Sequence, residues 1–446
     1  MKAPVASEPA SHQQPELWRQ LQWVAQVLLH IRSGVSGTAA LEEVPLPLRP
    51  GVQSLAFAVL RQLGRAEALR ALLAPRKPSP PADALLCTAL ALVWQEASAP
   101  YEVFTLVNQA VETAKRTPAM RAQANFINAC LRRFLREREA LVNATQNMPV
   151  ARWNHPAWWI KRLQTDYPEQ WQAILEANNR QAPMTLRVNA RQTDSASYLQ
   201  QLEAAGIAAH LSGASGITLN KATGVQNLPG FDAGWVSVQD AAAQMAAPLL
   251  LAGLPAGARV LDACAAPGGK TAHLLEMHDG EVTALDIDPE RCQRIEGTLT
   301  RLGLQAQVLV GDAAHPKTWW DGRLYDAILL DAPCTASGIV RRHPDVRWLR
   351  RETDVAQLAQ TQAALLKALW PLLKPGGRLL YCTCSVFKAE GDLQIQTFLA
   401  HNTQARKMPS VGHLLPKSTA IGDAVTDNQG IDHDGFYYAL LEKSTV

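Results

Sequence analysis

Two cysteine residues stand in short motifs whose chemistry suits covalent catalysis. Cys334 closes the segment D-A-P-C at residues 331–334, and Cys384 lies inside T-C-S at residues 383–385. A cysteine thiolate is a strong nucleophile, and a nearby carboxylate such as that of Asp331 can bind the polar edge of a substrate. The two motifs therefore supply two thiols and an acid that could belong to one reactive site.

A third motif, D-A-C-A-A-P-G-G-K at residues 262–270, is suited to holding a nucleoside. Gly268 and Gly269 permit close approach of a ligand to the backbone, and the helix that follows offers free N–H groups. Asp286 lies roughly 20 residues further on, where a carboxylate can accept hydrogen bonds from a ribose diol. Asp312 is placed to bind an adenine amino group. The motif lacks the first glycine of a P-loop, which disfavours a nucleoside triphosphate.

The seven cysteines of the chain are expected to be free thiols, because their number is odd and no export signal precedes them. A single residue separates Cys382 from Cys384, which is the wrong spacing for a zinc knuckle, so no metal site is expected. Cys382 is expected to lie on the face of its strand opposite Cys384, in the core. Three more cysteines, on expected helices, should be small packing residues: Cys87, Cys130 and Cys292.

Strands and helices alternate from residue 257 onward, which predicts a doubly wound, mostly parallel sheet. In such a sheet, ligands bind outside the carboxyl ends of the strands, so the motifs above should converge at one edge. A lone acid at a strand end is usually a helix cap, whereas four acids and two thiols at one edge indicate a site. The expected strands cover residues 259–263, 281–287, 307–310, 326–331, 378–382 and 435–441.

The first part of the chain has apolar residues at helical spacing from residue 15 to about residue 147, which predicts a helical bundle. The proline-rich residues 74–81 should connect two of its helices. A strand at 184–189 and a helix at 196–205 indicate a small α+β subdomain. We therefore expect three domains, covering residues 1–148, 149–235 and 236–446.

Composition indicates a globular protein, with 47% hydrophobic and 19% charged residues, and excludes a disordered chain. The apolar stretch Ala241 to Leu261 is interrupted by Pro248, Pro255 and Arg259, so it cannot span a membrane. Met1 to Gln14 has one lysine and no apolar core, which excludes a signal peptide and predicts a polar tail. We expect a cytoplasmic protein.

Basic charge is concentrated at the N-terminal end. Residues 1–150 carry 16 Lys and Arg against 11 Asp and Glu, whereas residues 151–446 carry 27 against 29. This asymmetry hints at a polyanionic partner for the helical part. Arg132 and Arg133, on its last long helix, are candidates for that contact, although for an isolated arginine cluster a solvated helix face is the more common explanation.

The motifs at 262–270, 331–334 and 383–385, in this order, resemble the RNA cytosine carbon-5 methyltransferases that use S-adenosylmethionine. Residues 107–112 and 126–133 are similar to the NusB-like RNA-binding domain, and the resemblance to the ribosomal branch of the family extends from Glu16 to Lys443. It implies an all-α NusB-like bundle, a small α+β RNA-binding subdomain and a C-terminal α/β Rossmann-like class I methyltransferase domain. The implied activity is methylation of carbon-5 of a cytosine in 16S ribosomal RNA through a covalent adduct at carbon-6.

The resemblance also implies roles for individual residues. Cys384 is the expected nucleophile and Cys334 assists product release. Asp331 is expected to hydrogen-bond the cytosine edge or to lie beside the cofactor, and Lys270 to hold Asp331 in place or to stabilise charge on the ring. Arg341 and Arg342 are expected to contact RNA with Arg132 and Arg133. The expected cofactor-binding residues are Ala263, Cys264, Ala265, Ala266, Pro267, Gly268, Gly269, Asp286, Asp312 and Asp331.

Several alternatives stay open from the residues alone. The Pro333-Cys334 dipeptide also occurs around the nucleophile of DNA cytosine methyltransferases, so the two thiols could exchange roles. An assembly factor with a decayed catalytic domain and a transfer-RNA methyltransferase are the competing functions, and the intact motifs argue against decay. We expect a monomer that acts on naked 16S ribosomal RNA or on an early assembly intermediate.

Overall fold

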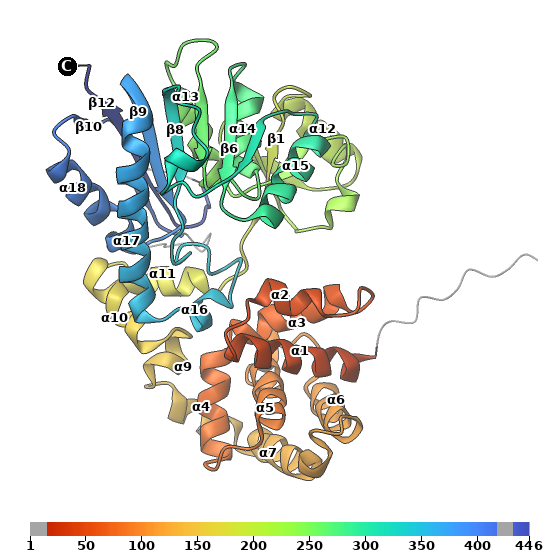
Figure 1. Cartoon of the computed structure of the whole chain (residues 1–446). Helices are drawn as coiled ribbons and strands as arrows, with labels where there is room; N and C mark the ends of the chain where they lie inside the picture. Colours follow the sequence, from red (N-terminus) through yellow and green to blue (C-terminus); the bar gives the residue numbers. More distant parts are fainter. Residues whose placement is uncertain (1–15, 417–430, 446) are drawn as a thin grey trace, which may run out of the picture. The chain divides into compact units, whose positions relative to one another are not determined.

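The computed structural model describes residues 16–416 and 431–445, so the predicted polar tail at Met1 to Gln14 lies outside the described residues. The chain divides into two compact units, Met1–Ala157 and Trp158–Val446 (Figure 1). The predicted domain boundaries near residues 148 and 235 stay predictions. None of the described helices has the length and apolar character needed to cross a membrane.

The first unit is helical in its described part, as predicted. Its centre is α5, in which every residue from Ala82 to Val93 is buried. The proline-rich connector was placed correctly, since α4 ends at Leu73 and α5 begins at Pro80. The helices are α1 (Leu17–Arg32), α2 (Gly37–Glu42), α3 (Arg49–Leu60), α4 (Leu63–Leu73), α5 (Pro80–Val93), α6 (Val103–Arg116), α7 (Ala124–Arg136), α8 (Arg138–Thr145) and α9 (Pro149–Trp153).

The second unit contains a small four-stranded antiparallel sheet in the order β2-β3-β1-β4. Helix α12 covers its apolar face, and the side chain of Asp194 caps this helix by accepting from the Ala196 and Ser197 amides. The predicted strand and helix of this subdomain are confirmed to within one residue. The elements are β1 (Met184–Val188), α12 (Ser195–Ala204), β2 (Ala209–Leu211), β3 (Gly216–Leu219) and β4 (Val236–Val238), preceded by α10 (Ala157–Asp166) and α11 (Trp171–Asn178).

The larger sheet has eight strands in the order β10-β12-β9-β8-β5-β6-β7, with β11 paired to β12. Neighbouring strands are parallel throughout the series β9-β8-β5-β6-β7, and β12 runs antiparallel to β9. All six predicted strands are present. Its strands are β5 (Val260–Ala263), β6 (Val282–Asp286), β7 (Gln307–Val310), β8 (Tyr325–Asp331), β9 (Leu373–Thr383), β10 (Ala405–Lys407), β11 (Gly412–Leu414) and β12 (Phe436–Lys443).

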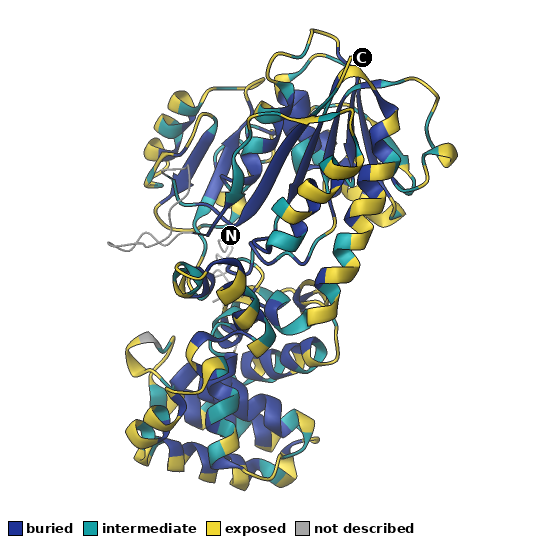
Figure 2. Ribbon diagram, turned by 90° about the vertical axis from the view of Figure 1, so that its left-hand side faces the viewer, coloured by how far each residue is buried: buried dark blue, intermediate teal, exposed yellow. Residues whose placement is uncertain are grey.

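Buried apolar side chains lie on both faces of this sheet, under helices that Figure 2 shows with buried inner and exposed outer faces. Along β5, Val260 belongs to one core cluster and Leu261 to the other, because successive side chains of a strand alternate. The helices of this layer are α13 (Ala246–Leu251), α14 (Gly269–Met277), α15 (Pro289–Leu302), α16 (Val346–Leu349), α17 (Glu352–Leu369) and α18 (Asp392–His401).

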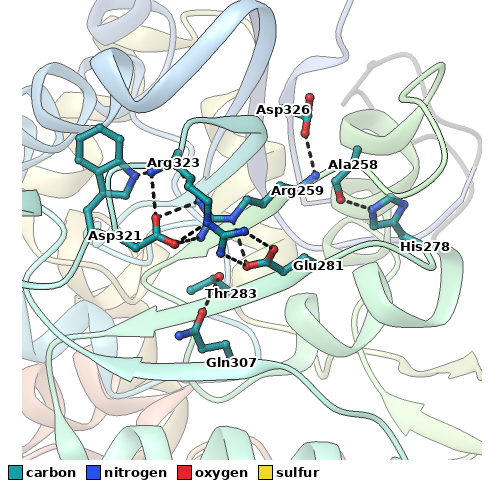
Figure 3. Close-up of polar contacts among 10 residues, drawn as sticks. Ala258, Arg259, His278, Glu281, Thr283, Gln307, Asp321, Arg323 and Asp326 are labelled. Atoms are coloured by element: carbon teal, nitrogen blue, oxygen red, sulfur yellow. Dashed lines mark hydrogen bonds and ion pairs between the residues drawn. The ribbon is translucent and has the colours of Figure 1, made fainter.

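The edge where the parallel strands begin is held by a charged cluster around Arg259 (Figure 3). The Arg259 amide donates to Asp326 at 2.8 Å, and its guanidinium contacts Glu281 at 3.1 Å and Asp321 at 2.8 Å. The cluster joins the chain just before β5, β6 and β8. It stabilises this edge, and the opposite edge carries the motifs with chemistry.

Candidate active site

The carboxyl ends of five neighbouring strands surround one cavity of about 400 Å³. The glycine turn follows β5, and the two cysteine motifs follow β8 and β9. This convergence is the one that parallel topology predicts. Residues from these strand ends that line the cavity are Cys264, Asp286, Asp312, Asp331, Cys334 and Cys384.

The turn between β5 and α14 contributes Cys264 and Ala266 to the cavity lining, and its glycine Gly268 packs against α15. Gly268 has φ +95°, and a Cβ atom there would lie 3.1 Å from the Cα of Ile295, so glycine is required. The next residue, Gly269, begins α14. Beneath the turn, the Thr271 hydroxyl donates to Asp262 at 2.6 Å, and burial raises the pKa of Asp262 to about 7.

Asp286 ends β6 at the floor of the cavity. Its Oδ2 accepts from the Ala266 amide at 3.1 Å and lies 3.5 Å from an Arg291 nitrogen. Asp288, two residues further on, caps α15 by accepting from the amides of Glu290 and Arg291. Asp286 is therefore the acid of this strand end that lines the cavity.

Asp312 follows β7 on the rim of the cavity. Its carboxylate accepts from the Ala314 amide at 2.8 Å and contacts the His315 ring at 2.8 Å. The hydrogen bond from Ala314 lowers the pKa of Asp312. The glycine turn, the two acids and the apolar walls Leu285 and Ile287 suit a nucleoside with a ribose diol, as in S-adenosylmethionine.

The two motif cysteines are in contact, with their Sγ atoms 3.4 Å apart. The hydrogen bond to Cys384, followed by burial, raises the pKa of Cys334 well above its usual range. Cys382 is buried, as predicted, but the expectation that it lies on the face opposite Cys384 is wrong: both cysteines pack in the same core cluster, because residues two apart in a strand share a face. The Cys382 Sγ lies 3.4 Å from Asp331 Oδ1.

Lys270 points from α14 toward the same place, with Nζ 2.6 Å from Asp331 Oδ2. Burial alone would lower the pKa of Lys270, but the Asp331 carboxylate and nearby sulfurs outweigh it, and the net direction is upward. Lys270 is therefore a fixed positive charge beside the cysteines. The structure brings Cys384, Cys334 and Asp331 together at one cavity, with Lys270 in contact with Asp331.

The predicted RNA-contacting arginines divide into two pairs. Arg341 and Arg342 are paired with buried acids, Arg341 with Asp434 at 2.5 Å and Arg342 with Asp240 at 2.7 Å. Arg341 is 1% exposed, so the expectation that it contacts phosphate is corrected: this pair ties the loop after β8 to the segment before β12. The sequence shows that these two arginines are charged, but it does not show the acids that pair with them in the folded protein.

Arg132 and Arg133 lie on the exposed face of α7. Arg132 donates to Asn128 at 3.1 Å, and Arg133 pairs with Glu137 at 3.0 Å. Both guanidinium groups remain accessible to a phosphate. Their contact with RNA stays a prediction.

Glu390 was missed by the sequence reasoning. It is fully buried directly behind the two cysteine motifs, although acids are rarely buried without a partner. Its partners are residue 385, five residues earlier, and residues 362 and 335, which are 28 and 55 residues away in sequence. Nothing in its local sequence distinguishes it from a surface acid.

Three family models match successive parts of the chain. The NusB family matches residues 35–136, a ferredoxin-like domain of RsmF/B-like methyltransferases matches residues 155–226, and the model described as 16S rRNA methyltransferase RsmB/F matches residues 250–442. With the α/β sheet and the cavity at its strand ends, these matches define the class of protein: a methyltransferase with two accessory domains.

Relatives match almost the full length. Ribosomal RNA small subunit methyltransferase B of Vibrio cholerae serotype O1 is 41% identical over 417 residues, which cover 92% of this chain and 94% of that one. The protein of the same name from Pseudomonas syringae pv. tomato is 43% identical over 413 residues, with coverage of 90% and 91%. The chain belongs to the ribosomal RNA small subunit methyltransferase B family.

Solved structures share the fold. The crystal structure of PH0851 has a TM-score of 0.73 at 24% identity, and the match covers 95% of this chain and 99% of that one. A methyltransferase homologue from Pyrococcus horikoshii has a TM-score of 0.54 at 25% identity, covering 66% and 97%.

Proposed function

We propose that this 16S ribosomal RNA methyltransferase acts on carbon-5 of a cytosine, through a covalent bond between Cys384 and carbon-6. The observation that carries the proposal is the contact between the two thiols, 3.4 Å apart, beside the Lys270–Asp331 pair at the nucleoside cavity. Methylation at a nitrogen or a ribose oxygen has no use for a nucleophilic thiol. Carbon-5 has one, because the cytosine ring is too electron-poor to react unaided.

S-adenosylmethionine, when bound, supplies an electrophilic methyl group. In this proposal, Asp286 would accept hydrogen bonds from its ribose diol, and the backbone at Gly268 and Gly269 would lie close to the rest of the molecule. Asp312, on the rim, would bind the adenine amino group. The same roles extend to the residues of the turn itself, which are Ala263, Cys264, Ala265, Ala266 and Pro267.

In the proposed reaction, the Cys384 sulfur forms a bond to carbon-6, and the electron pair of the ring double bond makes carbon-5 nucleophilic. Lys270 provides positive charge for the ring, and Asp331 binds its polar edge. After carbon-5 has gained the methyl group, a base removes its proton. The electron pair left behind re-forms the double bond and expels Cys384, a step assisted by Cys334.

The proposed substrate is naked 16S ribosomal RNA or an early assembly intermediate, met by a monomer in the cytoplasm. The NusB-like and ferredoxin-like domains would bind this RNA. Bisulfite sequencing of ribosomal and transfer RNA from cells with and without the protein tests the target. Loss of 5-methylcytosine from transfer RNA alone would contradict it.

The roles of the two thiols can be separated with labelled RNA, S-adenosylmethionine and a denaturing gel. Cys384→Ala should neither methylate nor form a covalent complex, because no enamine can be generated. Cys334→Ala should methylate once and remain attached to RNA through Cys384. Cys130→Ala, in the helical unit, is the matched control and should behave as wild type.

The reverse pattern, a trapped complex in Cys384→Ala and none in Cys334→Ala, would exchange the two roles. Retained activity in Cys384→Ala with no adduct in either variant would show that the covalent route is wrong.

A further inference from the structure

A buried carboxylate connects the two cysteine-bearing loops, which are the loop after β8 with Cys334 and the loop after β9 with Cys384. Glu390 ends a short 3-10 helix (Lys388–Glu390) and is 0% exposed. Its Oε2 accepts from the Thr335 hydroxyl at 2.5 Å and from the Ser385 hydroxyl at 2.6 Å. Its Oε1 accepts from the Thr335 amide at 2.9 Å and from the Gln362 side chain at 3.2 Å.

The contacts of Glu390 are arranged around the thiols. Thr335 directly follows Cys334, and Ser385 directly follows Cys384, so one carboxylate holds the residue after each cysteine. Such an arrangement fixes the two loops relative to each other without touching either sulfur.

Further hydrogen bonds join the same two loops. The Ser337 and Ser385 hydroxyls lie 2.8 Å apart, and the Gly338 amide donates to the Cys384 carbonyl at 2.9 Å. The Ser337 hydroxyl accepts from the Val386 amide at 2.9 Å. Glu390 is the charged centre of this network.

Burying a carboxylate at this position costs desolvation free energy. In the described part of the chain, its hydrogen-bond donors are uncharged, and no Lys, Arg or His nitrogen lies within ion-pair distance of it. The nearby Arg350 donates instead to the carbonyls of Thr335 and Cys334. A buried charge without a counter-ion destabilises a fold, so stability does not account for it.

The position of the thiols does account for it. In the proposed reaction, one sulfur bonds to carbon-6 while the other acts at the same ring. The distance between the two sulfurs must therefore be set before the cytosine enters the site. The negative charge of Glu390 is also one of the causes, after the hydrogen bond to Cys384 and burial, that raise the pKa of Cys334.

We propose that Glu390 is a positioning residue for the cysteine pair: its carboxylate holds Thr335 and Ser385 and thereby keeps Cys334 beside Cys384. The catalytic consequence rests on the proposed function. The placement of the two thiols does not, and it can be measured without RNA.

The first measurement is the rate at which the oxidant diamide forms a Cys334–Cys384 disulfide in the full chain. Two thiols lose two protons and two electrons, and diamide is reduced to its hydrazine. Glu390→Gln should form this disulfide about tenfold more slowly than wild type, the effect of losing one hydrogen bond to a charged group. Digestion without reductant followed by mass spectrometry identifies the bond.

The second measurement is single-turnover methylation of RNA at saturating S-adenosylmethionine. Glu390→Gln should lower the rate about tenfold or more, with the dissociation constants for cofactor and RNA unchanged. Glu390→Asp, which keeps the charge but shortens the reach, should be slow in both assays. Full recovery in Glu390→Asp would overturn positioning, because charge alone would then suffice.

A residue that contacts the same turn provides a matched control. Asp166 on α10 is also buried and accepts from the Lys388 amide at 3.1 Å, at the other end of the 3-10 helix, and among the described residues no hydrogen bond joins its carboxylate to Thr335 or Ser385. Asp166→Asn should leave both rates near wild type. Equal slowing in Asp166→Asn and Glu390→Gln would overturn the proposal, since any weakening of this turn would then have the same effect.

Ser385→Ala provides a second variant should Glu390→Gln fail to fold, because three donors to the carboxylate remain. It should slow disulfide formation and methylation together. Unchanged rates in both assays would overturn the proposal. A wild-type protein that forms the disulfide but never methylates RNA would contradict the proposed function alone.

Discussion

Single residues at this site are tuned by neighbours from different strand ends. Lys270 is buried yet charged, because Asp331 lies 2.6 Å from its Nζ. Asp262, on β5, forms no ion pair among the described residues and accepts from the Thr271 hydroxyl. The two acids of this region therefore differ: Asp331 is held by a cation, whereas Asp262 is penalised by burial.

Asp262 predicts a pH dependence of stability. Burial raises its pKa to about 7, so the folded state binds the proton more tightly than the unfolded state. The resulting stabilisation is complete below the ordinary Asp range near pH 4 and is lost as the pH rises through about 7.

Asp262→Asn cannot titrate, and between pH 5 and pH 8 its free energy of unfolding should fall by about 2–3 kcal/mol less than that of wild type. Urea denaturation at the two pH values measures the difference. The exposed Asp279→Asn should follow wild type. Parallel pH profiles for wild type and Asp262→Asn would mean that Asp262 is ionised throughout.

At the scale of elements, the helix that follows the glycine turn is anchored to the small sheet. Arg187 on β1 is fully buried and makes a two-pronged contact with Glu276 on α14, at 2.7 and 2.8 Å. It also donates to the Gly269 carbonyl at 2.8 Å. The strand of the ferredoxin-like domain thus holds both ends of the helix that begins at the cofactor turn.

Removing this anchor should affect stability and binding together. Arg187→Met leaves Glu276 buried without its cation, which should cost about 3–5 kcal/mol of unfolding free energy. Calorimetry should also show weaker binding of S-adenosylmethionine, because Gly269 loses its support.

The exposed pair formed by Arg191 and Asp279, at the end of the same helix, provides the control. Asp279→Ala should change neither quantity measurably, since exposed ion pairs contribute little. Unchanged cofactor affinity in a folded Arg187→Met protein would show that the turn holds its own shape.

Elements and motifs were predictable to different degrees, for physical reasons. The strand at 307–310 and the loops at 262–270 and 331–334 follow from local pattern and from parallel topology. Strands β10 and β11 have three residues each, too few to show alternation. Arg341 was misjudged and Glu390 was missed because each has a partner far away in sequence, Asp434 at 93 residues for Arg341 and Thr335 at 55 residues for Glu390, so that only the fold reveals their burial.

At the scale of the whole molecule, charge and chemistry lie in different units. Residues 1–150 carry the excess of basic charge, while the cavity and both cysteines belong to the second unit. Each unit has its own core, and the match to the ferredoxin-like domain begins at residue 155, before α10. This division predicts that RNA binding and cofactor binding can be separated.

A chain that starts at His155 keeps α10 whole and should bind S-adenosylmethionine as the full chain does. It should bind 16S ribosomal RNA more weakly, with a shallower slope of log affinity against log salt, because fewer counterions are released. In the full chain, Arg132→Gln with Arg133→Gln should reduce that slope by up to about 1.4–1.8, the value for two phosphate contacts. Filter binding over a salt series measures both slopes, and Glu139→Gln on neighbouring α8 should not make the slope shallower. Equal affinity and slope in the full and shortened chains would show that the basic face of α7 is solvated surface, and that the second unit alone grips the RNA.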